Sequence, residues 1–374
     1  MSAVGIGIIG AGVISDTYLE HLQAFGDTEV RIVGDLHVDR AAAQAQAHGV
    51  PAHGTAGDVL AHPEVELVIN LTIPAAHLDV SRAAIAAGKH VWTEKPLGLD
   101  LDGAAQLLRE ADAAGLRVGC APDTLLGPGF QAARRAIEAG RIGRPLFAQT
   151  AFQTQGPDLW HPNPGFLFAQ GAGPLMDMGP YYLSALVSIL GPVATVAAVG
   201  TKAQEEREIR TGPLAGTRFP VEVPSTIQLV AAFESGAQSQ SLLSFDSPLE
   251  RHGVVEIHGT EGSIVLPDPN RFAGRIAAVR PLGMLVDGLS HEQVWEEIPH
   301  PELEVGRGIG ALDMVRAIAE GRPHVASGEL GLHVLDTMLS AARSAETGRT
   351  EAVASSLAPV PLLPEGFDPF RATL

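Results

Sequence analysis

Residues 4–15, Val-Gly-Ile-Gly-Ile-Ile-Gly-Ala-Gly-Val-Ile-Ser, decide the fold of this chain. The first six form a short apolar run bounded by turn residues, which predicts a buried parallel strand. After the glycine turn, apolar residues recur at helical spacing, at Ile14, Tyr18, Leu19, Leu22 and Phe25. Residues 30–34 predict a second strand, and Asp35 stands at its end. Strand, turn, helix, strand and acid are, in this order, the parts of a dinucleotide-binding βαβ unit.

Each residue of the turn has a physical task in such a unit. Gly10 lets the chain turn sharply, and Gly12 has no Cβ, so a pyrophosphate can approach the backbone. The helix that starts at Val13 and Ile14 offers N–H groups and positive dipole potential. The third position of the fingerprint is Ser15 rather than glycine, although a small residue still permits close packing. A glycine-rich turn without a ligand is the alternative.

Composition bounds the class of protein. At 374 residues the chain can form two domains. A formal net charge of −18 without a basic run argues against a nucleic-acid partner. The single cysteine, Cys120, excludes an intrachain disulfide framework and a cysteine-cluster zinc site, and we expect no metal site. No apolar stretch is long enough to span a membrane, no signal peptide precedes the first strand, and we expect a cytoplasmic location.

The N-terminal third alternates strands with helices. This alternation predicts an α/β domain, a doubly wound, mostly parallel sheet covered on both faces, over residues 1–120. The remaining strands are expected at 67–71, 89–93 and 116–119, and the helices at 39–48 and 77–87. A further helix is expected to start at a cap, Asp100 or Asp102, and to run to 114.

Strands joined by tight turns dominate after residue 120. They predict an α+β domain over 121–374 with a large, mostly antiparallel sheet, and the terminal helices are free to pack back on the first domain. Residues 202–222 are polar and rich in proline and glycine, so we expect an exposed excursion there. The strands are expected at 145–155, 226–233, 237–245, 254–258 and 263–266, and the helices at 130–139, 175–190, 307–320 and 329–347.

Four segments occur in the order found in one family. They are Gly10-Ala11-Gly12, Thr72 to His77, Glu94-Lys95-Pro96 and the segment GPLMDMG at 173–179. The chain resembles the glucose-fructose oxidoreductase / inositol dehydrogenase (Gfo/Idh/MocA) family over nearly its whole length. The resemblance implies a Rossmann domain, an open-faced antiparallel sheet, a nicotinamide held between them, and hydride transfer at a carbinol carbon of a pyranose or polyol.

The expected cofactor is NAD rather than NADP. Asp35 lies 23 residues after Gly12 and is placed to accept hydrogen bonds from ribose hydroxyls, and it would repel a 2′-phosphate. NADP-binding relatives tend to carry Arg, Ser or Thr after this strand, where this chain has Leu36. The expected cofactor contacts are Gly10, Gly12, Val13, Ile14, Asp35, Thr72, Pro74, His77, Glu94 and Lys95.

Three residues are the candidates for chemistry. Lys95 follows a parallel strand at the edge where such sheets bind ligands, and its ammonium can polarise a substrate oxygen. Asp177 and Tyr181 share one helix face, so the acid can anchor a sugar hydroxyl while the tyrosine exchanges a proton. A surface lysine and a half-buried core tyrosine are the plain alternatives, and Tyr182 is the obvious core candidate.

Further substrate contacts are expected from two loops. Trp160 and His161 offer an aromatic platform and a hydrogen-bonding ring to a sugar, or else they cover the edge of the core. Asp123 can accept sugar hydroxyls or cap a helix. Two departures from the family bear on the substrate. Many members have His where this chain has Tyr181, and many have Asn-Arg-Arg where it has Ala-Pro-Asp at 121–123.

The leading interpretation is an NAD-dependent dehydrogenase or reductase of a sugar or polyol. An NAD-dependent glycosidase that oxidises its sugar transiently is a second possibility, and a non-catalytic dinucleotide-binding sensor is a third. The resemblance also suggests a homodimer or homotetramer assembled through the exposed face of the second sheet. Apolar rows of that sheet are expected to exceed what one helix layer covers: Leu229, Ala231 and Phe233, with Leu242 and Ser244.

Overall fold

The computed structural model describes residues 3–280 and 295–374. The chain forms two compact units, and both are assembled from separate stretches of chain. The first contains residues 1–127, 303–335 and 360–374, and the second contains 128–302 and 336–359. The division thus falls seven residues later than the expected boundary at 120/121, and two C-terminal segments belong to the first unit. In the described part of the chain no helix is long and apolar enough to cross a membrane.

The first unit is built on a six-stranded sheet in the order β3-β2-β1-β4-β5-β6, with every neighbouring pair parallel. This confirms the predicted doubly wound parallel sheet. The short strand β3 was not expected from the sequence. The bounds are β1 Val4–Ile9, β2 Thr28–Gly34, β3 Ala52–Gly54, β4 Leu67–Asn70, β5 His90–Thr93 and β6 Val118–Cys120.

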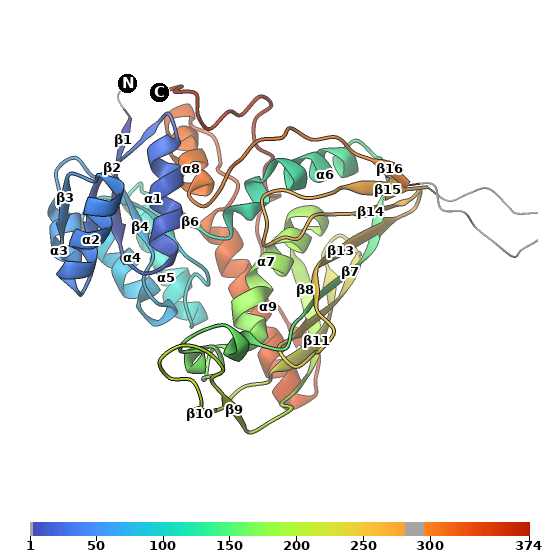
Figure 1. Cartoon of the computed structure of the whole chain (residues 1–374). Coiled ribbons are helices and arrows are strands. Elements are labelled where there is room, and N and C mark those ends of the chain that lie inside the picture. Colours follow the sequence, from blue (N-terminus) through green and yellow to red (C-terminus); the bar gives the residue numbers. More distant parts are fainter. Residues whose placement is uncertain (1–2, 281–294) are drawn as a thin grey trace, which may run out of the picture. The chain divides into compact units, whose positions relative to one another are not determined.

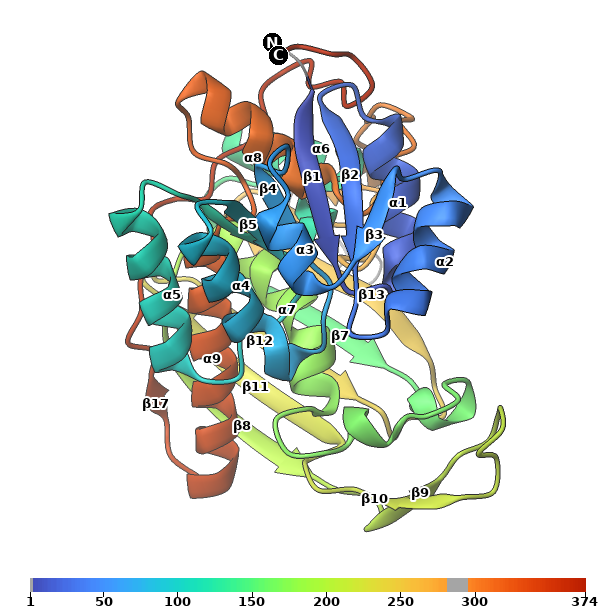
Figure 2. The same ribbon diagram turned by 90° about the vertical axis from the view of Figure 1, so that its left-hand side faces the viewer.

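Helices pack around this sheet in pairs: α1 contacts α2, and α4 contacts α5 (Figure 2). Their ends follow local capping rules. Gly49 ends α2 in the left-handed conformation, and Asp100 caps α5 by accepting a 2.6 Å hydrogen bond from the Gly103 N–H. The helices are α1 Ile14–Ala24, α2 Val38–His48, α3 Ala56–Ala61, α4 His77–Ala86, α5 Leu101–Ala113 and α8 Ile309–Glu320.

Helix α8 packs on the indole of Trp92 because its second residue is Gly310. A Cβ at Gly310 would overlap the six-membered ring of Trp92, which is fully buried.

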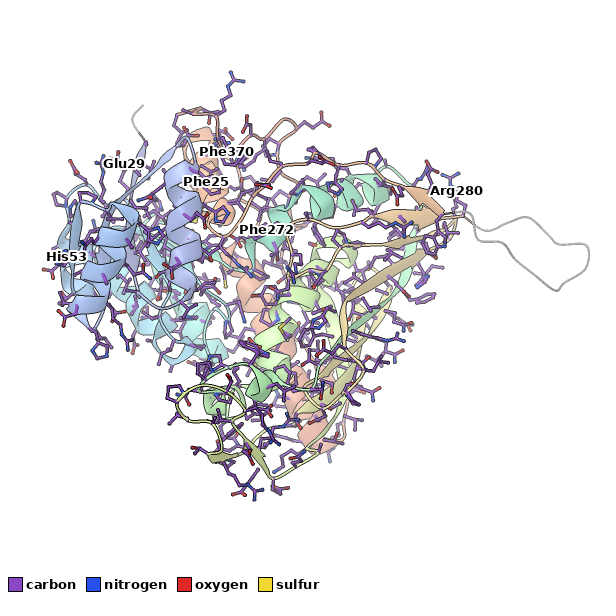
Figure 3. All side chains as sticks on the ribbon, in the orientation of Figure 1. Phe25, Glu29, His53, Phe272, Arg280 and Phe370 are labelled. Atoms are coloured by element: carbon purple, nitrogen blue, oxygen red, sulfur yellow. The ribbon has the colours of Figure 1, made fainter. Side chains whose placement is uncertain are left out.

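The C-terminal residues join the same unit. Arg316 on α8 donates to the buried carboxylate of Asp27 at 2.7 Å, and Phe370 lies beside Phe25 with ring centroids 6.0 Å apart (Figure 3).

The second unit contains a nine-stranded sheet in the order β16-β15-β14-β13-β7-β12-β11-β8-β17. All its pairs are antiparallel except β12 with β7. The longer strands are β7 Pro145–Gln153, β8 Val193–Thr201, β11 Thr226–Phe233, β12 Gln238–Ser244 and β13 Arg251–Gly259. The shorter ones are β14 Ser263–Val265, β15 Ala277–Val279, β16 Trp295–Glu297 and β17 Glu351–Ala352. A separate hairpin pairs β9 Glu206–Glu208 with β10 Arg218–Pro220, within the expected polar excursion.

Two helices cover one face of this sheet, as Figure 1 shows. Helix α7, Gly173–Leu190, contacts β7, β11 and β12, and the part of α9 (Gly328–Thr347) that belongs to this unit packs on α7. Gly179 on α7 leaves room for the Met338 thioether, and the Ser344 hydroxyl accepts a 2.8 Å hydrogen bond from the Ala198 N–H of β8. The remaining helix of the unit, α6, runs from Pro128 to Glu138.

The expectation for the first of the two apolar rows of this sheet was wrong, while Leu242 of the second row is half-buried. Leu229, Ala231 and Phe233 are fully buried, so the helix layer does cover them. The opposite face of β11 exposes Gln228 and Val230 instead. A period of two shows which residues share a face, but it does not show which face the helices cover.

The contact between Gly310 and Trp92 gives a stability prediction. Gly310→Ala should lower the free energy of unfolding by about 1–3 kcal/mol, because overpacking forces the buried indole or α8 to move. Urea unfolding followed by circular dichroism measures this change. Gly57→Ala is the matched control, since a Cβ there meets only the Thr55 hydroxyl, at an ordinary 3.5 Å. Equal stability of the two variants would contradict the proposed packing constraint.

Candidate active site

The carboxyl ends of β2, β1, β4 and β5 are adjacent in the first sheet, and they bring the predicted cofactor residues to one edge. The glycine turn follows β1, Asp35 follows β2, Thr72 follows β4, and Glu94 and Lys95 follow β5. Open parallel sheets bind ligands at this edge. Four segments that lie far apart in sequence therefore form one surface.

The glycine turn has the geometry that a pyrophosphate requires. Gly10 has φ +111°, and a Cβ there would lie 2.7 Å from the Leu71 carbonyl, so no other residue fits without strain. A Cβ at Gly12 would meet nothing within 4 Å, so the backbone borders open space at that point. The helix α1 starts immediately afterwards, with Val13 and Ile14 in its first turn. The turn therefore fits a dinucleotide.

Three large apolar side chains are exposed at this same edge: Val13 at 91%, Leu36 at 96% and Ile73 at 69%. They follow β1, β2 and β4, which are neighbours in the sheet. Apolar groups placed around a polar turn suit the flat faces of the adenine and nicotinamide rings. Sequence reasoning missed Leu36 and Ile73 as contacts, because exposure cannot be read from the residue type.

Asp35 is already hydrogen-bonded to the turn. Its Oδ2 accepts from the Ala11 N–H and its Oδ1 from the His37 N–H, both at 2.8 Å. The carboxylate is therefore held beside the glycine turn, and each oxygen keeps a second lone pair for a ribose hydroxyl. This is the orientation expected of an acid that selects NAD.

Asn70 was not predicted as a site residue, yet it organises the loop from Thr72 to His77. Its Oδ1 accepts from the Thr72 N–H and hydroxyl, at 3.2 and 2.6 Å, and its Nδ2 donates to the His77 carbonyl and the Ser81 hydroxyl. The side chain is fully buried at the end of β4. The sequence did contain one signal for this role, because Asn70 is a polar residue at the end of an otherwise apolar strand.

The structure leaves little of the His77 ring for the predicted cofactor contact. His77 does begin α4, but its ring is buried. Its nitrogens lie 2.6 Å from the Pro96 carbonyl and 3.0 Å from the Thr72 carbonyl. Burial lowers the pKa of the ring, although both carbonyls favour the proton. His77 therefore holds the loops at Thr72 and Pro96 together from the buried side. Thr72 and Pro74, which lies in a short 3₁₀ turn, are partly exposed.

Glu94 and Lys95 stand where β5 ends. The Tyr18 hydroxyl donates to Glu94 at 2.9 Å and itself accepts from the Trp92 indole N–H at 3.1 Å. The other Glu94 oxygen accepts from the Lys95 N–H. The Lys95–Pro96 bond is cis. The lysine side chain is partly exposed.

The structure corrects the substrate role expected for Asp123. The carboxyl is fully buried and accepts from the Gly308 N–H at 2.7 Å and from Arg307 at 3.3 Å. It therefore caps the start of α8 and has no surface left for a sugar. Burial raises its pKa, and the neighbouring Glu94 carboxylate adds to this effect while Arg307 opposes it.

The other predicted catalytic residues lie in the second unit, on α7. Asp177 is partly exposed and Tyr181 is buried, one turn further along the helix. Tyr182 is the core tyrosine, since it is fully buried and its hydroxyl accepts from the Gly253 N–H at 2.9 Å. Lys95 belongs to the first unit, so the structure describes the two halves of the predicted catalytic group separately, and their roles stay predictions.

The loop before α7 carries an aromatic cluster larger than expected. Trp160 is 68% exposed, and the His161 ring lies edge-on to it with centroids 5.6 Å apart. Phe166, which sequence reasoning missed, lies edge-on to His161 at 5.4 Å and is also exposed. The exposed rings are available to a ligand, and the role of Trp160 and His161 as a sugar platform stays a prediction.

Two family models match the chain, one over each unit. A model described as "Oxidoreductase family, NAD-binding Rossmann fold" matches residues 4–121, and one described as "GFO/IDH/MocA C-terminal domain" matches residues 130–265. Together they cover more than half of the chain. The boundary between them agrees with the division of the structure near residue 127.

Named relatives align over most of their own length. A 1,5-anhydro-D-fructose reductase of Ensifer adhaerens is 26% identical over 94% of this chain and 99% of the relative. A D-xylose dehydrogenase of Paenarthrobacter nicotinovorans is 26% identical over 75% of each chain. Among solved structures, a levoglucosan dehydrogenase in complex with NADH and L-sorbose has a TM-score of 0.81 at 22% identity, over 94% of this chain and 99% of that one. This last similarity supports the fold.

The position of Asp35 gives a prediction about cofactor choice. A 2′-phosphate near its carboxylate costs about 4 kcal/mol per charge at ~4 Å and an effective dielectric of 20. We expect NADH to bind at least about tenfold more tightly than NADPH, a factor worth about 1.4 kcal/mol. Asp35→Ala should reduce that preference, mainly by weakening NADH. Titrations followed by nucleotide fluorescence measure both constants without a substrate.

Asp39→Ala is the control for this experiment, because Asp39 is exposed on α2 only four residues away. It should leave the preference unchanged. Equal affinities of the wild type for the two nucleotides would show that Asp35 does not select NAD.

Proposed function

Because the chain belongs to the Gfo/Idh/MocA oxidoreductase family, we propose that it transfers a hydride between NAD and a carbinol or carbonyl carbon of a sugar or polyol. The observation that carries this proposal is the strand edge where the open glycine turn, Asp35 and Lys95 converge. The carbohydrate substrates named for the relatives support the substrate class.

The residues of the chain divide the work of oxidising an alcohol. NAD, when bound, supplies the carbon that accepts or returns the hydride. The Lys95 ammonium polarises the oxygen of the reacting carbon and stabilises the negative charge that develops there. Tyr181 exchanges the hydroxyl proton through its phenol oxygen, and Asp177 accepts a hydrogen bond from a neighbouring hydroxyl. Asp177 and Tyr181 lie one turn apart on α7, which suits adjacent hydroxyls of one ring.

Absorbance at 340 nm tests the proposed reaction directly. A screen of aldoses, polyols and anhydrosugars with NAD⁺ should find net NADH formation, and the corresponding keto compounds should consume NADH. Lys95→Ala should lower turnover by roughly 10²–10⁴-fold, the range for a positioned acid or base. Its NADH affinity and melting temperature should stay near the wild-type values. Turnover within a few-fold of the wild type would remove Lys95 from the mechanism.

Tyr181→Phe separates chemistry from packing, because it removes one hydroxyl and little volume. We predict a large fall in turnover with a nearly unchanged melting temperature. Tyr182→Phe is the matched control, since it removes the hydroxyl that accepts from the partly exposed Gly253 N–H and should cost about 0.5–1.5 kcal/mol of stability. Its activity per folded molecule should stay normal. If Tyr182→Phe lost turnover and Tyr181→Phe lost only stability, Tyr182 would be the catalytic tyrosine and Tyr181 the core tyrosine.

We also propose that the chain forms a homodimer or homotetramer through the open face of the nine-stranded sheet. Phe147, Val199 and Val230 are exposed on β7, β8 and β11, which belong to this one sheet. In a monomer these apolar side chains would stay in contact with water, whereas a symmetric contact of the same face would bury them.

Light scattering at micromolar concentration should therefore report at least a dimer. Val230→Glu should shift the mass toward the monomer, because it places a charge in the proposed interface. Leu214→Glu serves as the control, since Leu214 is exposed in the polar excursion rather than on the sheet. A monomeric wild type would refute this proposal and leave the proposed chemistry intact.

A further inference from the structure

A cavity of about 240 Å³ opens in the second unit between the loop after β7 and the strand β9. Its polar lining combines amide, carboxylate and guanidinium groups, from Gln155, Asp158, Gln204, Arg207, Glu208 and Asp246. None of these residues was a candidate from the sequence. The loop that forms one wall continues directly into the aromatic platform at Trp160.

A buried arginine fixes the floor of this cavity. Arg207 Nη1 donates to the Gln155 carbonyl at 2.8 Å and to Asp158 at 2.7 Å, and Nη2 donates to the Phe245 carbonyl at 2.7 Å and to Asp246 at 2.5 Å. The guanidinium charge is therefore matched by two carboxylates and two carbonyls. A floor with all these contacts made is rigid before any ligand arrives.

The lining identifies the chemical class of ligand. Its carboxylates and guanidinium groups nearly balance, which disfavours a strongly charged ligand. The side-chain amides of Gln155 and Gln204 are exposed and have no partner in the described part of the chain, and each offers both donors and an acceptor. Vicinal hydroxyls of a neutral ring need this mixture, while Leu159 provides apolar contact for the C–H face of the ring.

The cavity and α7 lie at the same edge of the sheet. A Cβ at Gly173, the first residue of α7, would lie 3.1 Å from the Pro224 carbonyl, and the next two residues after Pro224 donate to Asp246 in the cavity floor. A row of aromatic side chains connects Arg207 to α7 on the helix-covered side, with centroids 5.6–6.3 Å apart: Phe168, Phe245, Phe152 and Tyr182. Asp177 and Tyr181 follow in the first turns of this helix.

We propose that this cavity is a subsite for the second ring of a two-ring carbohydrate, whose reacting ring is held by Asp177 and Tyr181. The proposal rests on the proposed sugar oxidoreductase function and narrows its substrate class. The preferred substrate is a disaccharide or glycoside rather than a free monosaccharide. Trp160 and His161 lie on the segment of chain that joins the two ring positions.

Steady-state kinetics with matched sugars test the subsite. The probes are D-glucose against cellobiose and maltose, and D-xylose against xylobiose. In the wild type, kcat/KM for the best two-ring sugar should exceed that of its parent by about tenfold or more, mainly through KM, since the second ring adds binding away from the reacting carbon. The Gln155→Ala/Gln204→Ala variant should lower this ratio at least about fivefold, the loss expected for two ordinary hydrogen bonds.

Gln46→Ala on α2 is the matched control and should leave the ratio unchanged, because Gln46 is exposed in the first unit. A wild type without preference for two rings, or a preference that the double variant keeps, overturns the subsite while the oxidoreductase function stands. Calorimetric titration of cellobiose, maltose and xylobiose into the NADH-loaded enzyme gives the second readout. If the enzyme oxidises no sugar, the proposed reaction is rejected. In that case, two-ring sugars that bind to the wild type but not to the double variant support the subsite. If no two-ring sugar binds to the wild type, the subsite is overturned.

Discussion

One buried hydrogen-bond chain joins the glycine turn to the strand that carries Lys95. The Trp92 indole donates to the Tyr18 hydroxyl, Tyr18 donates to Glu94, and Glu94 accepts from the Lys95 N–H. Tyr18 lies on α1, the helix that follows the turn, and Trp92 lies on β5. Burial and the nearby carboxylates of Glu94 and Asp123 raise the pKa of Tyr18, so its hydroxyl stays a donor. This hydrogen-bond chain thus fixes α1, the helix after the glycine turn, relative to the end of β5 that carries Lys95.

The second unit meets a different constraint, because its loops at residues 154–172 and 202–222 contain only short 3₁₀ turns and the β9–β10 hairpin. Ordering such loops costs conformational entropy, which ladder hydrogen bonds do not offset there. Arg207 provides the compensation by joining β9 to two other backbone segments, residues 155–158 and 245–246, through one guanidinium. A buried ion pair stabilises only when its hydrogen bonds are satisfied, and here two carboxylates and two carbonyls accept from it. The aromatic platform at Trp160 follows two residues after Asp158 and so starts from a fixed point.

What the sequence predicts correctly depends on residues close together in the chain. The predicted ranges of α2 and α5 are close to the observed ones because Gly49 ends α2 and Asp100 caps α5 through partners within a few residues, and short apolar runs indicate the parallel strands. Asp123 was misjudged because its partners, Arg307 and Gly308, lie about 185 residues away. Arg207 was hidden in a polar segment that indicates exposure, and its ion-pair partners are 49 and 39 residues distant. Burial of a polar residue is a tertiary property, so no local pattern reveals it.

These two constraints place cofactor choice and substrate choice in different parts of the chain. Asp35, the acid proposed to select NAD, accepts from Ala11 in the turn that Gly10 shapes, so replacing it disturbs the conformation of that turn. The loop at 154–172 takes no part in the six-stranded sheet, and its exposed Trp160 and Phe166 lie outside the Arg207 contacts. Substitutions at Trp160 or Phe166 should therefore change the surface proposed to face the sugar at little cost in stability. On the proposed function, substrate range is the property that this architecture can change most easily, provided that Arg207 is kept.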